Sequence, residues 1–262
     1  MVSKRLMRHL SEKQALMKGI KCWGGRGLVG SDLIAQTGAL SIDEGDYNHQ
    51  PGDLVLNVRE TSSKRLAEQD LPSFLAQSAD KSLNLYRMLS STDVRLIYFS
   101  TLDFNQNIYC DLKRWLEKLP GMFLKPDQYK VVRLPGVLGT QLRKGPVFDV
   151  MRANMFAETD VSLNLIDTRE ISRLVHHLSE RWDDEPTEIN LTPSAPVTLR
   201  DVWSVVHNAC DCKMPEALSL DQQEAFLQGD ATSESSFMLD TSEFYLRRFL
   251  KDYGPVCHKP ES

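Results

Sequence analysis

The sequence predicts an α/β fold, in which a doubly wound parallel sheet is joined to a small C-terminal lobe. Two observations lead to this prediction. Short apolar segments alternate with amphipathic helical segments between residues 19 and 181, and a glycine-rich turn joins the first strand to the first helix. Strands of a parallel sheet are buried on both faces and read as continuous apolar runs, as residues 53–58 do.

The expected elements follow one another along the chain. A short strand, poor in apolar residues, is expected at 19–23, a helix at 28–36, and a thin second strand at 39–42. Pro72 falls in the first turn of a later helix, where proline is tolerated, and Pro120 with Gly121 ends the next one. The remaining strands are expected at 53–58, 94–99 and 129–134, and the remaining helices at 71–89, 108–119, 147–155 and 171–181.

The character of the sequence changes after Trp182, where Pro186, Pro193 and Pro196 separate short elements. We therefore expect the doubly wound domain to span 18–182, with contributions from later segments, and the small lobe to span 183–253. An N-terminal helical extension is expected at 1–17 and a flexible tail at 254–262.

Composition excludes several classes of function. The 262 residues carry a net charge of −5 and 41% hydrophobic residues, with no basic run and no apolar run near the ~18–20 residues of a membrane span. We therefore expect neither a nucleic-acid partner nor a membrane partner. The five cysteines are odd in number and irregularly spaced, which indicates a reduced, cytoplasmic protein. Cys210 and Cys212, near His207, could be metal ligands or two thiols at a helix end; we expect no metal.

The glycine turn has the spacing G-x-x-G-x-x-G at Gly24, Gly27 and Gly30. Glycine lets the backbone take positive φ and approach a pyrophosphate closely, and the following helix directs its free N–H groups toward the phosphates. A dinucleotide site also needs an acid about 20 residues further on, and Asp43 or Glu44 supplies one. The alternative is a plain tight turn between strand and helix.

Tyr109 and Lys113 stand four residues apart on a predicted helix, so both side chains share one face. A lysine ammonium beside a phenol lowers the phenol pKa from about 10 and prepares it to move a proton. Ser100 and Thr101 end the preceding strand and could hydrogen-bond the same substrate oxygen. An isolated pair of this kind is usually a surface pair, but its place after the Ser-Thr strand favours the catalytic interpretation.

These motifs resemble those of the extended short-chain dehydrogenase/reductases, the NAD-dependent epimerase/dehydratase family, and are most similar to the dTDP-4-dehydrorhamnose reductase branch. The resemblance covers residues 18 to 255, and the colinear order of its motifs is what makes it specific. The matching segments are 24–30, 53–57, 98–104, 109–113, 131–139, 165–171, 188–191, 196–202 and 237–244.

The resemblance implies a Rossmann-type NAD(P)-binding domain and a cofactor that is NAD or NADP. It further implies an oxidoreductase or epimerase acting on a nucleotide-linked sugar, with Tyr109 as general acid/base and Lys113 on the nicotinamide ribose. Thr101, with Ser100, would orient the substrate oxygen. A nucleotide-sugar substrate is the expected partner, and the resemblance is compatible with a homodimer. The cofactor contacts that it implies are Gly24, Gly27, Leu28, Val29, Gly30, Asp43, Asn57, Lys113 and Pro135.

Three departures favour an alternative, a non-catalytic regulatory or scaffold member of the same family. Only 22 residues separate Gly30 from Asp53, where the family has a strand, a helix and a further strand. The family's active-site asparagine falls on Ser78, and the first strand is polar for a central strand. The choice between NAD and NADP stays open, because Arg26 could meet a 2′-phosphate while Asp43 would favour a free 2′-hydroxyl.

Overall fold

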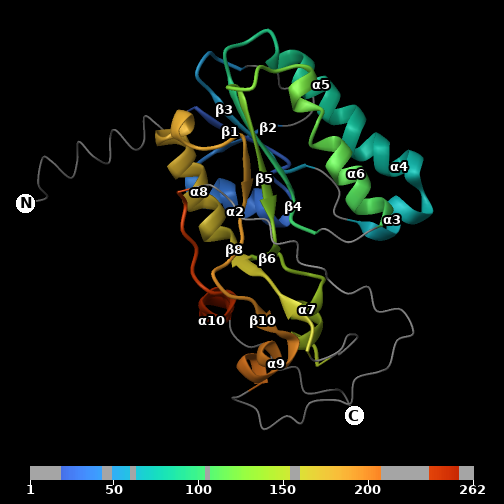
Figure 1. Ribbon diagram of the computed structural model, residues 1–262, viewed down its shortest axis with the longest axis vertical. Helices are drawn as coiled ribbons and strands as arrows, with labels where there is room; N and C mark the ends of the chain where they lie inside the picture. Colours follow the sequence, from blue (N-terminus) through green and yellow to red (C-terminus); the bar gives the residue numbers. More distant parts are fainter. Residues whose placement is uncertain are drawn as a thin grey trace, which may run out of the picture.

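The computed structural model describes residues 19–42, 49–59, 63–103, 107–153, 160–207 and 236–253. Its main feature is a six-stranded sheet with the order β2-β1-β3-β4-β5-β9, in which every neighbouring pair is parallel (Figure 1). The predicted doubly wound α/β fold is therefore confirmed. The expected extension at 1–17 and tail at 254–262 lie outside the described residues.

The expected elements follow one another in the predicted order, and α3 is a further helix that the sequence analysis did not predict. The strands of the large sheet are β1 (Ile20–Trp23), β2 (Leu40–Ile42), β3 (Leu54–Asn57), β4 (Arg95–Thr101), β5 (Tyr129–Leu134) and β9 (Glu188–Asn190). The helices beside it are α2 (Leu28–Thr37), α3 (Lys64–Gln69), α4 (Leu71–Leu75), α5 (Lys81–Leu89), α6 (Ile108–Leu116) and α8 (Thr168–Glu180). The remaining elements are β6 (Gly136–Leu138), α7 (Pro146–Met151), β7 (Ser162–Leu163), β8 (Leu165–Asp167), β10 (Val197–Thr198), α9 (Leu199–His207) and α10 (Ser242–Tyr253).

Three expected helices differ from the structure, of which the one expected at 147–155 ends at Met151. The helix expected at 71–89 is divided by a π-helical segment, Ala76–Asp80, between α4 and α5. The helix expected at 108–119 ends at Leu116, and a 3-10 turn, Pro120–Met122, follows. A π-turn differs from an α-helix only in its i→i+5 hydrogen bonds over a few residues, which is too short a segment for the apolar periodicity to identify.

The polarity of β1 is explained by an ion pair at the amino end of the sheet. β1 lies between β2 and β3, and all four of its residues are buried. Lys21 is 8% exposed, and its Nζ lies 2.7 Å from Oδ2 of Asp53, the residue before β3. The charge is thus compensated, which is the condition for burying a lysine in a central strand.

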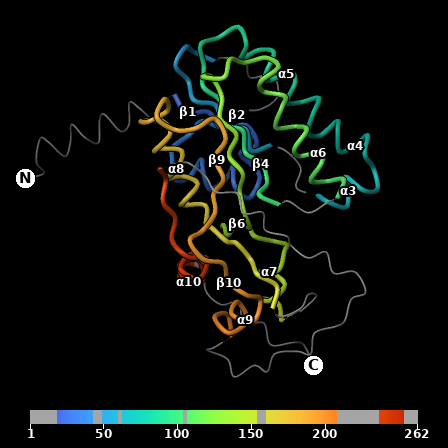
Figure 2. Tube along the Cα trace, in the orientation of Figure 1, coloured from blue at the N-terminus to red at the C-terminus, as the bar shows by residue number. Residues whose placement is uncertain are grey.

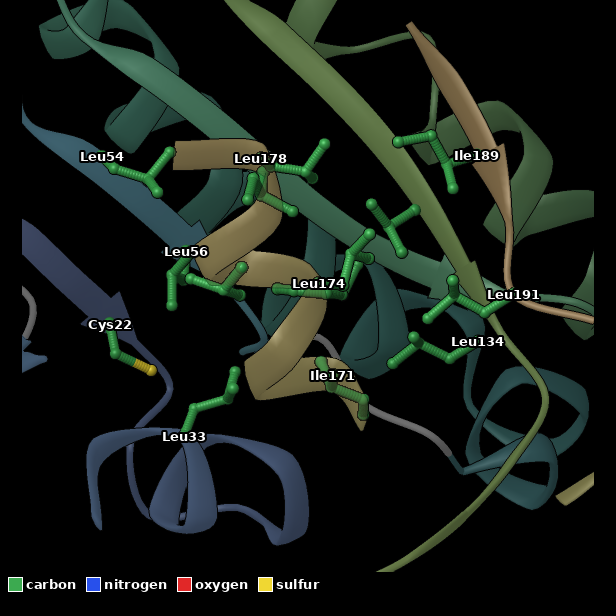
Figure 3. Packing of buried hydrophobic residues seen from close by; sticks show 14 of the residues in the cluster. Cys22, Leu33, Leu54, Leu56, Leu134, Ile171, Leu174, Leu178, Ile189 and Leu191 are labelled. Atoms are coloured by element: carbon green, nitrogen blue, oxygen red, sulfur yellow. The ribbon is translucent and has the colours of Figure 1, made fainter. Parts of the chain in front are cut away.

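Helices cover both faces of the sheet. On one face, α2 and α8 pack side by side, although they are far apart in the sequence (Figure 2). Ile171, Leu174 and Leu178 of α8 belong to the same apolar cluster as Leu56 of β3 (Figure 3). On the other face, α4, α5 and α6 pack against the remaining strand side chains.

A second core lies beyond the carboxyl ends of the strands and is formed by α7, α9 and α10 with β6, β7 and β8. The chain crosses between the large sheet and this second core more than once. Helix α7 precedes residue 182 but packs in the second core, whereas β9 follows residue 182 but pairs with β5 of the large sheet. None of the described helices is both long enough and apolar enough to cross a membrane.

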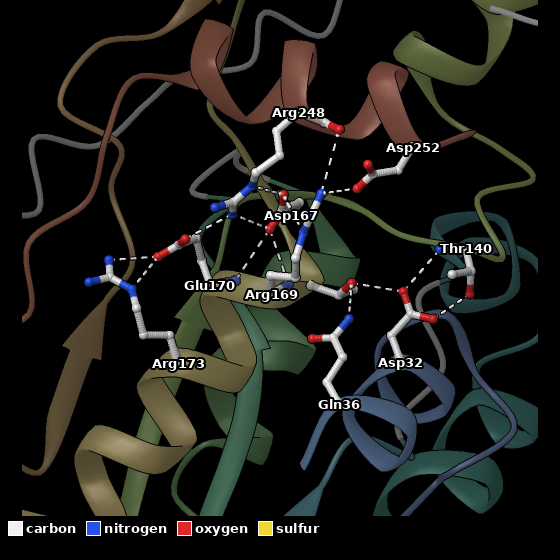
Figure 4. A network of polar contacts seen from close by, with 10 residues as sticks. Asp32, Gln36, Thr140, Asp167, Arg169, Glu170, Arg173, Arg248 and Asp252 are labelled. Atoms are coloured by element: carbon white, nitrogen blue, oxygen red, sulfur yellow. Dashed lines mark hydrogen bonds and ion pairs between the residues drawn. The ribbon is translucent and has the colours of Figure 1, made fainter. Parts of the chain in front are cut away.

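Charged side chains fasten α10 to the start of α8 (Figure 4). Asp167 caps α8 by accepting the backbone N–H groups of Arg169 and Glu170, and it also accepts two bonds of 2.5 Å from the Arg248 guanidinium. Arg248 donates a further bond of 2.8 Å to Glu170. The side chains of Asp167 and Glu170 are 4% and 6% exposed, so Arg248 compensates two carboxylates that water scarcely reaches.

We expect Arg248→Met to lower the free energy of unfolding by about 3 kcal/mol, because the two buried carboxylates lose the least exposed of their cations and keep only the more exposed Arg169 and Arg173. Urea unfolding followed by circular dichroism measures the change. The matched control is Arg247→Met on the same helix, whose ion pair with Glu243 is more than half exposed and contributes at most about 0.5 kcal/mol. Equal effects of the two substitutions would contradict this role of Arg248.

Candidate functional site

A pocket of about 310 Å³ opens at the carboxyl ends of β3, β4 and β5 and at the amino end of α2. In a doubly wound sheet, this edge is where ligands bind. Its lining draws on segments far apart in the chain, and it brings together many of the predicted site residues. The lining residues are Gly27, Leu28, Val29, Val58, Phe99, Ser100, Thr101, Tyr109, Lys113, Leu134, Pro135 and Val137.

Two glycines allow backbone segments to touch at the entrance to this pocket. Gly24 has φ +103°, and a Cβ there would lie 2.6 Å from the Cα of Arg59. A Cβ on Gly30 would lie 2.3 Å from the carbonyl oxygen of Gly24. Both distances are shorter than any real contact, so no other residue fits these two positions without moving the backbone. Gly24 and Gly30 therefore hold the turn closed against β3 and α2.

Gly27 has a different role, because its missing side chain faces open space. A Cβ there would meet one atom within 4 Å, the Gly24 carbonyl oxygen at 3.6 Å. Gly27 is the N-cap of α2 and offers no side-chain cap, and the first turn of the helix holds no acidic residue. The helix therefore directs free backbone N–H groups and the positive end of its dipole into the pocket. This cradle fits a pyrophosphate.

Tyr109 and Lys113 stand on the opposite wall of the pocket. α6 begins at this point because the Asn107 side chain accepts the backbone N–H of Cys110 at 2.9 Å. The side of the helix that carries the pair faces inward, and Tyr109 and Lys113 are 5% and 4% exposed. The Tyr109 ring packs edge to face on Phe74, with centroids 6.1 Å apart. The surface-pair interpretation of Tyr109 and Lys113 thus does not match their burial.

The two hydroxyls at the end of β4 differ in what they can offer a ligand. The Ser100 hydroxyl donates to Glu117 Oε1 at 2.6 Å, so it presents lone pairs to the pocket. Thr101 Oγ1 accepts the backbone N–H of Asp103 at 3.1 Å and keeps its own proton available for donation. Thr101 is therefore the better donor to a substrate oxygen, and Ser100 the better acceptor.

Glu117, which the sequence analysis did not single out, holds this end of the sheet together. Its carboxylate accepts bonds from Arg114 and Arg133 as well as from Ser100, and it is 8% exposed. Arg133 continues the network to Glu188 beside β5. Glu117 lies four residues after Lys113 on the same face of the α6 region, and that spacing is the signal that could have found it.

Asn57 ends β3 and contacts α5, and Ser78 lies in the π-helical segment before α5. Asn57 is fully buried, and its amide donates to Tyr86 Oη at 3.0 Å, while its oxygen accepts the backbone N–H of Arg59 at 3.2 Å. Asn57 thereby orients the exit of β3, and its direct cofactor contact stays a prediction. The Ser78 hydroxyl is buried and has no hydrogen-bond partner among the described residues.

A second cavity, of about 230 Å³, adjoins the first and shares Gly27 and Val58 with it. It contains two side chains that the sequence analysis did not single out, Trp23 and Arg59, and the Arg59 guanidinium lies 4.9 Å from the centroid of the Trp23 ring. Asp43 lies outside the described residues. The full lining is Trp23, Gly24, Gly25, Arg26, Gly27, Ile42, Val58 and Arg59.

The described residues contain no group of three or more side chains able to hold a metal ion, and Cys210 and Cys212 lie outside them. Burial raises the pKa of the Cys110 thiol, beside Tyr109, to about 11 and that of Cys22 to about 12. Both thiols are therefore protonated at neutral pH, which argues against nucleophilic roles for them.

No protein-family model and no curated protein sequence matches this chain. Solved structures do. The structure of dTDP-4-dehydrorhamnose reductase from Bacillus anthracis with NADP matches 89% of this chain and 97% of its own, with a TM-score of 0.73 and 12% identity. UDP-N-acetylglucosamine 4-epimerase from Methanobrevibacter ruminantium matches the same shares with a TM-score of 0.71 and 14% identity. WbmG from Bordetella bronchiseptica with NAD matches 93% and 97%, with a TM-score of 0.68 and 17% identity.

The chain has the fold of these epimerases and reductases. The predicted resemblance is thus confirmed for the fold. Because the sequence identities are low, any activity must be argued from the geometry of the site. β2 is an edge strand, and no described strand lies beyond it, which agrees with the shortened segment between Gly30 and Asp53.

The two kinds of glycine predict different outcomes for one substitution. We expect Gly30→Ala to lower the free energy of unfolding by about 1–3 kcal/mol, because its methyl group would overlap the Gly24 carbonyl. Gly27→Ala should change it by less than about 0.5 kcal/mol, since its methyl group enters open space. Urea unfolding of both variants measures the difference. An equal loss of stability in both variants would contradict the different surroundings of Gly27 and Gly30.

Proposed function

We propose that this chain is an NAD(P)-dependent oxidoreductase or epimerase acting on a nucleotide-linked sugar. The observation that carries the proposal is the common pocket of the α2 amino end and the Tyr109/Lys113 pair, which are distant in sequence and meet at the sheet's carboxyl edge. The likeness to epimerases and reductases solved with NAD or NADP supports it.

The cofactor would lie across the carboxyl edge of the sheet. Gly27 and the first N–H groups of α2 would hold its pyrophosphate, and the apolar wall of Val29, Leu134 and Pro135 would accept the nicotinamide ring. Lys113 would bind the nicotinamide ribose. When bound, the nicotinamide supplies the hydride chemistry that protein side chains lack.

The side chains of the protein would carry out the proton transfer. Tyr109 would give a proton to the substrate's carbonyl oxygen or take one from its hydroxyl, and the Lys113 ammonium would favour the phenolate form. Thr101 would donate a hydrogen bond to the same oxygen and hold it beside the phenol. Ser100, oriented by Glu117, would accept a hydrogen bond from a neighbouring substrate hydroxyl.

The second candidate is a non-catalytic member that keeps the fold and a nucleotide. Two observations favour it. Ser78 replaces the expected asparagine and has no hydrogen-bond partner in the part of the chain that the structure describes, and no described strand lies beyond the short edge strand β2. Cofactor binding without turnover on a panel of UDP- and dTDP-sugars would select this candidate over the enzyme.

We expect Gly27→Val to abolish binding of NADH and NADPH, because its side chain would occupy the space of the pyrophosphate. Titration calorimetry measures the affinity, and an unchanged thermal midpoint shows that the fold is intact. Retained affinity in a folded variant would rule out the glycine turn as the cofactor cradle. Absence of binding to the unmodified chain at millimolar concentration would overturn the proposed function itself.

Tyr109→Phe removes the proton and keeps the ring, so we expect turnover to fall by about 10²–10⁴ with little change in cofactor affinity. Product chromatography on the nucleotide sugar that the panel identifies measures the rate. The control is Tyr129→Phe at the opposite end of the sheet, which should leave turnover unchanged. If Tyr109→Phe turns over like the unmodified chain, the tyrosine serves packing.

A further inference from the structure

The chain leaves the large sheet at the end of β5 and enters β6, and this crossover forms one wall of the pocket. Leu134, Pro135 and Val137 belong to the pocket lining. Among the described strands, β6 pairs only with β8, in a two-stranded sheet that is separate from the large one. The backbone hydrogen bonds of the large sheet therefore end before this wall, and its position depends on what holds β6 and β8.

The carboxylate of Asp32, in the second turn of α2, binds the segments that follow both of these strands (Figure 4). Thr140, two residues after β6, donates its hydroxyl to Oδ1 of Asp32 and its backbone N–H to Oδ2, the latter at 2.9 Å. Thr168, the first residue after β8, donates its hydroxyl to the same Oδ2 at 2.7 Å. The Gln36 side chain donates to the Thr168 oxygen at 3.2 Å, which leaves the Thr168 proton directed at Asp32. One carboxylate thus ties both strands to the helix that carries the phosphate cradle.

The contact between α2 and the end of β6 leaves no room for a side chain at Gly139. A Cβ there would lie 2.7 Å from Oδ2 of Asp32 and 3.1 Å from Cδ1 of Leu28, which itself lines the pocket. Asp32 is 3% exposed, so water competes little for its hydrogen bonds. The three donors described above are uncharged groups of Thr140 and Thr168, so the anchor depends on hydrogen-bond geometry and a neutral amide could replace the carboxylate.

We propose that Asp32 is a positioning residue of the pocket, which holds the wall of Leu134, Pro135 and Val137 against the nicotinamide ring of the cofactor. This inference rests on the proposed function, in which Leu134 and Pro135 face that ring. Asp32 acts through Thr140 and Thr168 and is not itself part of the pocket lining. Without the anchor the wall can move outward, and a gap of about 0.5–1 Å already forfeits a quarter to a half of each van der Waals contact. The pyrophosphate contacts come from the glycine turn and do not depend on this wall.

Calorimetric titration of the full chain with NADH and with ADP-ribose tests the inference, because ADP-ribose has the same pyrophosphate and adenosine but no nicotinamide ring. If NADPH binds more tightly than NADH, the pair is NADPH and 2′-phospho-ADP-ribose. We expect Asp32→Ala to weaken the cofactor by about tenfold or more and the ADP-ribose by less than about threefold. Asp32→Asn should restore the affinity, since its amide oxygen accepts from the Thr140 N–H and from Thr168 while its amide nitrogen donates to the Thr140 hydroxyl.

The second variant, should Asp32→Ala fail to fold, is Gly139→Ala, whose methyl group would push the chain away from Asp32 and Leu28 and should act in the same direction. The matched control is Thr37→Val on the same helix. It removes a buried hydroxyl that donates to the Leu33 carbonyl, and it should leave both affinities unchanged. An equal loss of cofactor and ADP-ribose in folded Asp32→Ala, or no loss of either, would overturn the inference and leave the proposed function standing.

Hydrogen exchange of the chain without cofactor separates this inference from the proposed function. Asp32→Ala should speed amide exchange in the peptides that cover β6 and β8 by about fivefold or more, and Thr37→Val should not. Unchanged exchange in these peptides of Asp32→Ala would overturn the inference, whatever the cofactor does. If exchange is faster but the unmodified chain binds neither NADH nor NADPH, Asp32 stands as the anchor of this wall and the proposed function is overturned.

Discussion

The close contact between Gly24 and its two backbone neighbours is the constraint on which the site depends. It brings the exit of β1, the exit of β3 and the first turn of α2 to one place, at the point where the strand order reverses. Both cavities lie against this point and share the Gly27 that it exposes. A longer side chain at Gly24 or Gly30 would separate these segments, and the phosphate cradle and the arginine beside it would no longer face the same space.

A second constraint fixes the helix that carries the Tyr/Lys pair. Glu117 accepts hydrogen bonds from Ser100 of β4 and Arg133 of β5, so the carboxyl end of α6 is bound to these two strands. Through Glu188, the same network reaches β9. The pocket walls therefore belong to one rigid arrangement of α6 and the sheet, in which the helix cannot slide without breaking buried charge-assisted bonds.

Local sequence patterns predicted the features that depend on residues close together in the chain. Strand runs, the glycine spacing and the Tyr109/Lys113 periodicity are read within a few residues, and the strands of the large sheet fell close to their expected places. Long-range partners were not predictable in this way. Lys21 made β1 look unsuitable for a central strand because its partner, Asp53, comes from another strand–loop junction. Arg59 is a single residue at a strand exit, and its relation to Trp23 depends on the parallel register of β1 and β3. The pairing of β9 with β5 likewise depends on a return of the chain that no local pattern encodes.

The position of α10 has a consequence for biosynthesis. This helix gives Tyr245 to the core beneath the sheet and Leu246 and Phe249 to the second core, and its Arg248 neutralises the carboxylates that begin α8. Translation delivers it after every other described element. A ribosome-bound chain that lacks these residues exposes two unfinished apolar surfaces, and the acidic start of α8 keeps only its more exposed cations, so the chain depends on chaperones or on rapid completion to avoid aggregation.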